Sequence, residues 1–341
     1  MNIVITGGAG FLGARLARSL LTQGQLSLAG GRAQAITRLS LVDRVNPSPE
    51  LLADTRVQAV VGDLNDLLRL TPSGARAVPA GTDVVFHLAA AVSGECEADF
   101  DLGMRSNFAA THALLEACRA LKTRPTVVFA SSLAVYGNPP GQALPAVIED
   151  NTLPTPQSSY GIQKFIGEQM VADFGRKGFV RARNIRLMTV SVRPGKPNGA
   201  ASSFFSGMIR EPLAGVRAQV PVPPQTPVAL SSPRSTIAGI LRAAETTDSD
   251  WGALNAMNLP ALRTTVGEMA AALERVAGKA ATDLLDWDED PVILKLVNTW
   301  PGNVQAARAA ALGLHPDADF ESIVREYVRE NPNAVRLPVQ P

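Results

Sequence analysis

A glycine-rich segment close to the start of the chain restricts the fold more than any other feature. Residues 6–13, Thr-Gly-Gly-Ala-Gly-Phe-Leu-Gly, directly follow a short apolar run at residues 3–5 that is typical of a buried strand. Glycines at this spacing allow a tight turn into a helix and let a pyrophosphate approach the backbone. The first helical N–H groups then point at the phosphates. The expected cofactor-binding residues of this loop are Gly7, Gly10, Phe11, Leu12 and Gly13.

The N-terminal half continues as an alternation of strand and helix patterns. Further apolar runs lie at residues 39–42, 57–61, 84–86 and 126–130, and helical patterns lie at 11–21 and 106–121. Continuous apolar runs suit strands that are buried on both faces. The alternation therefore predicts an α/β fold of Rossmann type, with a doubly wound parallel sheet. Residues 22–36 carry three glycines and are expected to form an extended surface loop.

Two aspartates follow the second and third apolar runs. Asp43 can accept hydrogen bonds from the adenosine ribose hydroxyls and would repel a 2′-phosphate, which favours NAD over NADP. Arg44 follows directly, and its guanidinium could bind that phosphate, so the strength of the preference stays open. Asp63 ends the third run and could meet the adenine amino group.

Beyond residue 190 the strand-helix regularity weakens. Proline-rich stretches occupy residues 193–197 and 221–227, and short helical patterns lie at 235–244, 265–276 and 320–328. We therefore expect an NAD-binding domain over residues 1–190 and a smaller C-terminal substrate-binding lobe over 191–341. Some segments of that lobe could return to the sheet, whose carboxyl edge is where open α/β folds bind ligands.

A tyrosine and a lysine four residues apart indicate the chemistry. Tyr160 and Lys164 would share one face of a helix, which the preceding Ser158-Ser159 pair can start. A phenol with a pKa of about 10 is a poor base, but an ammonium one turn away lowers that pKa. Alcohol oxidation removes a hydride and a proton, so Tyr160 is the candidate base. Ser132, after the fifth apolar run, could donate to the substrate oxygen or bond its own turn backbone.

Composition excludes several other classes of protein. The net charge of +1 gives no long-range attraction to nucleic acid or to anionic membranes. The spacing of the two cysteines does not indicate a disulfide framework. The three histidines are not spaced as metal ligands, so we expect no metal. No apolar run reaches the roughly 18 residues that span a bilayer, and no basic leader precedes the first strand. We expect a soluble, cytoplasmic protein.

These motifs resemble the extended short-chain dehydrogenase/reductase family, also described as the NAD-dependent epimerase/dehydratase family. The resemblance covers nearly the whole chain. Its motifs are residues 6–13, Asp43, 62–64, 87–90, Asn107, 131–137, Tyr160 with Lys164, and 193–195. It implies that Ser132 is the catalytic hydroxyl and that Lys164 also holds the nicotinamide ribose. It also implies further cofactor-binding residues, namely Asp63, Leu64, Leu88, Ala89, Ala90, Asn107, Tyr160 and Lys164.

Departures from the family pattern narrow the activity. Leu133-Ala134 stand where dehydratases carry an Asp-Glu pair, which argues against dehydration. Residues 193–198 differ from the usual aromatic and Asn-rich version, which argues against a nucleotide-sugar pocket. Residues 91–95, 193–205 and 231–234 are similar to members that oxidise the C2 hydroxyl of small sugar acids. That similarity implies substrate-binding residues Ser93, Ser132, Tyr160, Asn198 and Arg234.

Arg234 is the expected partner of the substrate carboxylate, because a guanidinium binds a carboxylate in bidentate fashion. A surface arginine at a helix start is the alternative interpretation of this residue. A second candidate activity is an NAD-dependent nucleotide-sugar 4-epimerase, which would use the same tyrosine and lysine without net redox. An NAD-sensing binding protein on the same fold is the non-enzymatic alternative. The partners considered are the small sugar acid and a second copy of the chain in a homodimer.

Overall fold

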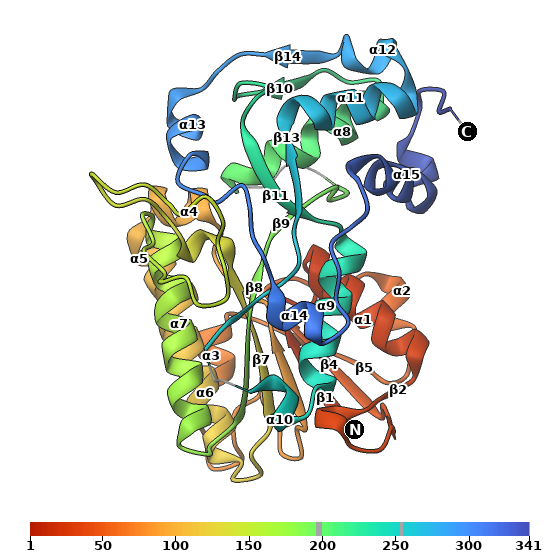
Figure 1. Ribbon diagram of the computed structural model, residues 1–341. Helices are drawn as coiled ribbons and strands as arrows, with labels where there is room; N and C mark the ends of the chain where they lie inside the picture. Colours follow the sequence, from red (N-terminus) through yellow and green to blue (C-terminus); the bar gives the residue numbers. More distant parts are fainter. Residues whose placement is uncertain (196–199, 253–254, 341) are drawn as a thin grey trace. The chain divides into compact units, whose positions relative to one another are not determined.

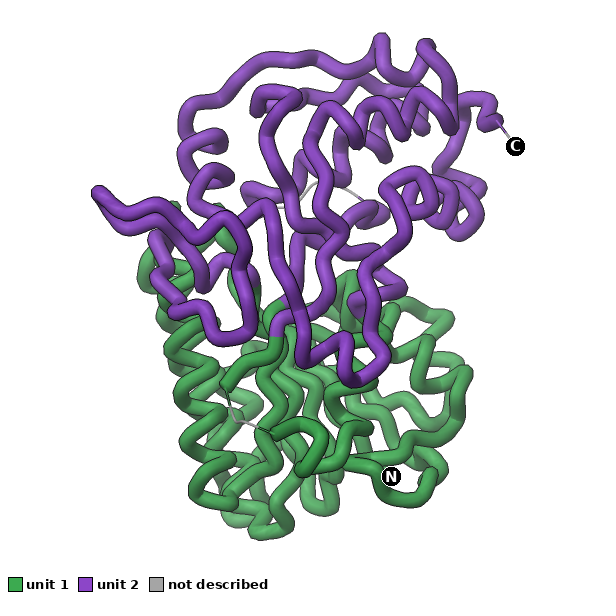
Figure 2. The backbone as a smooth tube through the Cα atoms, viewed as in Figure 1, with its two compact units in different colours: residues 1–132, 159–186, 237–257 green, residues 133–158, 187–236, 258–341 purple. Residues whose placement is uncertain are grey.

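The computed structural model describes residues 1–195, 200–252 and 255–340. The chain divides into two compact units that interleave along the sequence (Figure 2). Unit 1 contains Met1–Ser132, Ser159–Arg186 and Ile237–Met257, and unit 2 contains Leu133–Ser158, Leu187–Thr236 and Asn258–Pro341. The assignment of residues 1–190 to an NAD-binding domain and of 191–341 to a substrate-binding lobe stays a prediction.

Unit 1 is built on a seven-stranded sheet with the strand order β12-β8-β7-β6-β1-β4-β5. Its strands are β1 (Asn2–Thr6), β4 (Arg38–Asp43), β5 (Val57–Val61), β6 (Val84–His87), β7 (Thr126–Ser132), β8 (Arg181–Leu187) and β12 (Met257–Asn258). The pairings of β1 with β4 and β6, of β4 with β5 and of β6 with β7 are parallel. The five predicted strands and the doubly wound α/β fold are thus confirmed.

Helices lie on both faces of this sheet, as Figure 1 shows, with α3, α6 and α7 on one side and α1, α2 and α9 on the other. Val85, Val127 and Phe129 of the sheet share one buried cluster with Leu114 and Val171 of these helices. The bounds are α1 (Phe11–Gln23), α2 (Pro49–Leu52), α3 (Leu64–Leu68), α4 (Ser93–Ala98), α5 (Phe100–Gly103), the π-helix η2 (Met104–Ala109), α6 (Ala110–Ala120), α7 (Ser159–Arg176), α9 (Pro233–Glu245) and α10 (Asp248–Trp251).

The segment after α1 differs from the expected extended loop. β2 (Gln25–Leu26) pairs antiparallel with β3 (Gln34–Ala35), and the short helix η1 (Leu28–Gly30) lies between them. Gly24 ends α1 with a φ of 69°, a left-handed conformation that glycine adopts without strain. These two-residue strands are mostly exposed, so no apolar alternation marks them in the sequence.

Unit 2 has its own core. Phe205 and Met208 of α8, Leu273 of α11, and Phe320 and Ile323 of α15 belong to a single buried cluster. Its elements are η3 (Leu133–Val135), β9 (Thr189–Val190), η4 (Ala201–Ser203), α8 (Phe204–Leu213), β10 (Ala218–Val220), β11 (Pro227–Ser231), β13 (Leu262–Thr265), α11 (Val266–Ala277), α12 (Lys279–Thr282), β14 (Leu285–Trp287), α13 (Pro291–Val297), α14 (Ala307–Ala311), α15 (Phe320–Glu330) and η5 (Pro332–Ala334). The helices predicted at 265–276 and 320–328 are confirmed as α11 and α15, and that at 235–244 as α9.

None of the helices within the described ranges is both long and apolar enough to cross a membrane.

Candidate active site

The glycine-rich loop joins β1 to α1 with its backbone tightly packed. The N–H groups of Gly7 and Gly8 both donate to the carbonyl of Val42, at 2.9 and 3.2 Å. A Cβ on Gly13 would lie 2.1 Å from the carbonyl oxygen of Gly7, and a Cβ on Gly7 would lie 3.0 Å from the nitrogen of Ala89. The N-cap Gly10 provides no side-chain hydrogen bond to α1. The first N–H groups of α1 are therefore suited to a phosphate, and the loop fits a dinucleotide.

Acidic residues surround the end of β4 beside this loop. Asp43 accepts a hydrogen bond from the N–H of Ala9 at 3.0 Å through Oδ2. Asp63 caps α3 by accepting from the N–H of Asn65 at 2.9 Å, and its Oδ2 pairs with Nη2 of Arg44 at 3.0 Å. Burial acts to raise the pKa of Asp63, but the bonds from Asn65 and Arg44 outweigh it and hold that pKa below its usual value. Arg44, the residue that could accept a 2′-phosphate, is thus already paired.

A buried hydrogen-bond chain runs through His87 at the end of β6. Thr111 Oγ1 donates to the carbonyl of Asn107 at 2.7 Å, so towards His87 Nε2, 3.0 Å away, it must accept. His87 therefore carries its proton on Nε2, and Nδ1 accepts from Thr6 Oγ1 at 2.7 Å. Burial, followed by the charge of Lys164, lowers the pKa of His87 to about 3. The neutral ring links the glycine-rich loop to the π-helix.

Asn107 lies in that π-helix and fixes the segment after β6. Its Oδ1 accepts from the N–H of Ala91 at 2.8 Å, while Nδ2 donates to the carbonyl of Ala91 at 3.1 Å and to Oε1 of Gln163 at 2.8 Å. The amide is 3% exposed and engaged at both ends. Asn107 therefore contacts the expected cofactor site through the stretch that follows Leu88, Ala89 and Ala90, and through α7.

The predicted tyrosine and lysine lie near the start of α7, and Ser132 ends β7. Lys164 is 4% exposed, and its Nζ donates to the carbonyl of Ala130 on β7 at 2.8 Å. The same nitrogen lies 5.7 Å from the ring centroid of Tyr160. Burial lowers the pKa of Lys164 to about 8, against the opposing charges of Cys96 and Glu168. A buried cation therefore stands one helical turn from Tyr160, as a phenolate base needs.

Sequence reasoning missed Glu168 and Arg186, which form a buried ion pair behind this site at 2.7 Å. Glu168 stands one turn after Lys164 on α7, so the helical spacing could have indicated it. Arg186 comes from β8, and no local sequence pattern predicts that Glu168 is its partner.

The predicted substrate-binding residues have different settings. Ser93 begins α4 in unit 1 and is 6% exposed. Arg234 lies in unit 2, where its Nε is 3.0 Å from Oε2 of Glu326 and its Nη2 is 4.0 Å from Oδ1 of Asp317. Its side chain is 70% exposed. Asn198 lies outside the described residues.

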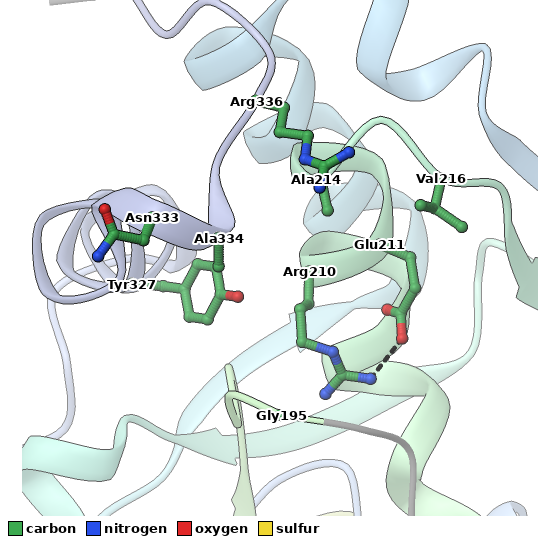
Figure 3. A pocket seen from close by; sticks show the side chains of 9 residues that line it. All are labelled: Gly195, Arg210, Glu211, Ala214, Val216, Tyr327, Asn333, Ala334 and Arg336. Atoms are coloured by element: carbon green, nitrogen blue, oxygen red, sulfur yellow. Dashed lines mark hydrogen bonds and ion pairs between the residues drawn. The ribbon is translucent and has the colours of Figure 1, made fainter.

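Unit 2 also contains a pocket of about 340 Å³, lined from α8, α15 and the segment after α15. Figure 3 shows Arg210 and Glu211 paired within it and the hydroxyl of Tyr327 directed towards them. The nine described lining residues include none of the predicted site residues.

Within the described ranges, no group of three or more His, Cys, Asp or Glu could hold a metal ion.

Comparisons with known proteins agree with this geometry. The model of the NAD dependent epimerase/dehydratase family matches residues 3–225. The chain is 51% identical to a D-erythronate dehydrogenase of Cupriavidus necator, over 97% of this chain and 98% of that protein. It is 39% identical to a D-erythronate dehydrogenase of Haemophilus influenzae, over 96% of this chain and 99% of that protein.

Solved structures show the same architecture. A nucleoside-diphosphate-sugar epimerase from Agrobacterium tumefaciens superposes with a TM-score of 0.85 at 37% identity, covering 98% of this chain and 95% of that one. An L-threonine 3-dehydrogenase from Trypanosoma brucei gives a TM-score of 0.81 at 21% identity, covering 99% of both chains. The second likeness concerns the fold alone.

Proposed function

Because this chain belongs to the NAD-dependent epimerase/dehydratase family, we propose that it oxidises the C2 hydroxyl of a small sugar acid. Its cofactor is NAD, and it is an oxidoreductase that acts on a CH–OH group. The proposed substrate is D-erythronate, and the product is 2-dehydro-D-erythronate. The observation that carries this proposal is the nearly full-length similarity to two D-erythronate dehydrogenases.

The residues of unit 1 suit the binding of NAD. The glycine-rich loop and the N-terminus of α1 would hold the pyrophosphate. Asp43 would accept hydrogen bonds from the adenosine ribose, and Lys164 would donate to the nicotinamide ribose. When bound, NAD supplies the acceptor for the hydride that leaves C2.

The remaining chemistry is a proton transfer by this chain's own side chains. Tyr160, as a phenolate, would accept the proton of the C2 hydroxyl. The ammonium of Lys164, 5.7 Å from the ring centroid, stabilises that phenolate. Ser132 would donate a hydrogen bond to the same substrate oxygen as it becomes a carbonyl. Hydride and proton leave different atoms of the alcohol, so the oxidation is balanced.

A direct assay tests the proposal. Purified protein is mixed with NAD and D-erythronate, and NADH is followed by its absorbance. We expect one NADH for each acid molecule oxidised. Failure to reduce NAD with any four- to six-carbon sugar acid would refute the assignment.

A nucleotide-sugar 4-epimerase is the second candidate, because the chain is 37% identical to a nucleoside-diphosphate-sugar epimerase of known structure from Agrobacterium tumefaciens. Interconversion of nucleotide-sugars without net NADH would establish it. NAD binding without turnover of either substrate would favour the third candidate, an NAD-sensing binding protein.

We also propose a cytoplasmic location and a homodimer with neither nucleic-acid nor membrane partners. Light scattering of the purified protein tests the dimer.

The choice between NAD and NADP should depend on Asp43. We expect kcat/KM to be at least about tenfold higher with NAD than with NADP, because Asp43 would face the 2′-phosphate. Asp43→Asn should narrow this ratio, while Asp66→Asn, an exposed acid on α3, should leave it unchanged. Steady-state kinetics with both cofactors measures it. Equal efficiency with NADP would mean that Arg44 leaves Asp63 and binds the phosphate.

Arg234 should bind the carboxylate of the sugar acid. We expect Arg234→Ala to raise KM for the acid by about 10–100-fold, since charge-assisted hydrogen bonds are lost. Arg234→Lys keeps the charge but loses the planar fork, so it should be impaired less. Arg217→Ala removes another exposed, ion-paired arginine of unit 2 and should leave KM within about twofold. An unchanged KM in Arg234→Ala would show that Arg234 is a surface arginine that pairs with Glu326 and does not bind the substrate.

A further inference from the structure

Behind the end of β7 lies an ion pair that water hardly reaches. Glu168 of α7 exposes 1% of its side chain, and Arg186 of β8 exposes 4%. Arg186 binds in bidentate fashion, with Nε 2.9 Å from Oε1 and Nη2 2.7 Å from Oε2. The backbone carbonyl of Glu168 also accepts from Nδ2 of Asn184 at 2.9 Å. The pair therefore joins α7 firmly to β8.

A third group extends this connection to β7. The hydroxyl of Ser131 donates to Oε1 of Glu168 at 2.5 Å. Ser131 immediately precedes Ser132 in β7. Glu168 therefore holds the β7 backbone directly before the residue that carries the Ser132 hydroxyl. Three elements, β7, α7 and β8, meet at one carboxylate.

Stability alone gives little reason for such a pair. Removing two charges from water costs about as much as their attraction returns, and packed apolar residues of similar volume are often equally stable or more so. A bidentate pair does, however, fix distance and orientation better than apolar contacts. What this pair fixes is the separation of Ser132 from the face of α7 that carries Tyr160 and Lys164.

We propose that Glu168 and Arg186 are positioning residues that act through Ser131 to hold the Ser132 hydroxyl in register with Tyr160. The inference rests on the proposed function, which assigns Ser132 and Tyr160 their roles. Both groups must reach the same substrate oxygen, one as donor and one as proton acceptor. A displacement of about 1 Å between them can cost about 100-fold in rate.

The same carboxylate has a second, electrostatic effect on Lys164. The groups that face Lys164 are Tyr160 and Glu168 on α7, His87 on β6, Cys96 on α4 and the Ala130 carbonyl on β7. Burial lowers the pKa of Lys164, and the negative charge of Glu168 opposes this. Without that charge, and with Arg186 left unpaired behind it, Lys164 would lose its proton at lower pH. Position and charge can therefore be separated by mutation.

Ser131→Ala tests position alone, because it leaves both charges in place. We expect kcat for the sugar acid to fall by about 10–100-fold, with the Kd of NAD and the pH profile unchanged. Ser40→Ala is the matched control, since Ser40 is a buried serine of β4 whose hydroxyl has no hydrogen-bond partner in the described structure. An unchanged kcat in Ser131→Ala, or an equal fall in both variants, would overturn the positioning role.

Glu168→Gln tests charge. We expect the alkaline limb of kcat/KM to move to lower pH by about one unit, while Glu168→Asp, which keeps the charge, loses rate without moving that limb. NMR titration of the Lys164 ammonium should show the same shift without any substrate. If the wild-type protein oxidised no sugar acid, the proposed function would fail. Independently of that result, an unchanged pKa of Lys164 in Glu168→Gln would contradict this inference. Should Glu168→Gln not fold, faster hydrogen exchange at residues 130–133 in Ser131→Ala than in wild type supports it, and equal exchange overturns it.

Discussion

Tyr160→Phe should reduce turnover of the sugar acid by about 10²–10⁴-fold while the Kd of NAD stays within about twofold. The substitution removes only the hydroxyl that would accept the substrate proton. The ring keeps its place on α7, 5.7 Å from the ammonium of Lys164, so cofactor contacts should persist. Steady-state kinetics gives kcat, and calorimetric titration with NAD gives the Kd.

Tyr136→Phe is the matched control for this experiment. Tyr136 is 1% exposed, and its hydroxyl donates to Oδ1 of Asn258 at 2.9 Å. Its loss leaves a buried acceptor unsatisfied, which costs about 1–3 kcal/mol of stability, so Tm should fall while kcat stays near the wild-type value. Near-normal turnover in Tyr160→Phe, or equal losses in both variants, would assign the proton transfer to another group.

Four of the five strands that were predicted from sequence are buried between two layers of helices, and the fifth, β5, is a partly exposed edge strand. Buried strands need apolar residues on both faces, so β1, β4, β6 and β7 read as continuous apolar runs. β8 occupies an equally central place, but its sequence is Arg-Ala-Arg-Asn-Ile-Arg-Leu. Arg183 is paired with Asp248 at 2.7 Å and Arg186 with Glu168. Because partners far along the chain neutralise these charges, no local pattern could predict the strand.

The same distinction applies to the candidate site. The proximity of Tyr160 and Lys164 was predictable, because residues four apart share one face of a helix and this spacing can be read from the local sequence. The surroundings of Arg234 could not be predicted from local sequence, since Glu326 approaches from α15. The direction of the His87 hydrogen bonds likewise depends on Thr6 and Thr111, which the fold alone brings together. Local spacing thus indicated the proposed reacting groups, and tertiary contacts supplied the residues around them.

Gly13→Ala should weaken NAD binding by about 10–100-fold and lower Tm. The added Cβ would stand 2.1 Å from the Gly7 oxygen and 2.8 Å from the Gly8 Cα. Both are backbone atoms of the turn that would surround the pyrophosphate, so the turn must open, at a cost typical of overpacking of about 1–3 kcal/mol. An opened turn also withdraws the first N–H groups of α1 from the phosphates.

Gly207→Ala provides the comparison, because it is the same change inside another helix. There the nearest atom to a new Cβ is the end of the flexible Glu211 side chain at 3.1 Å, which needs to shift by only a few tenths of an ångström, and alanine favours a helix by about 1 kcal/mol over glycine. Gly207→Ala should therefore bind NAD as the wild type does, with an unchanged or slightly higher Tm. Calorimetric titration and thermal unfolding measure both quantities. If Gly13→Ala lowered Tm but kept its affinity for NAD, the turn would matter for folding only, and the pyrophosphate would have to bind elsewhere in unit 1.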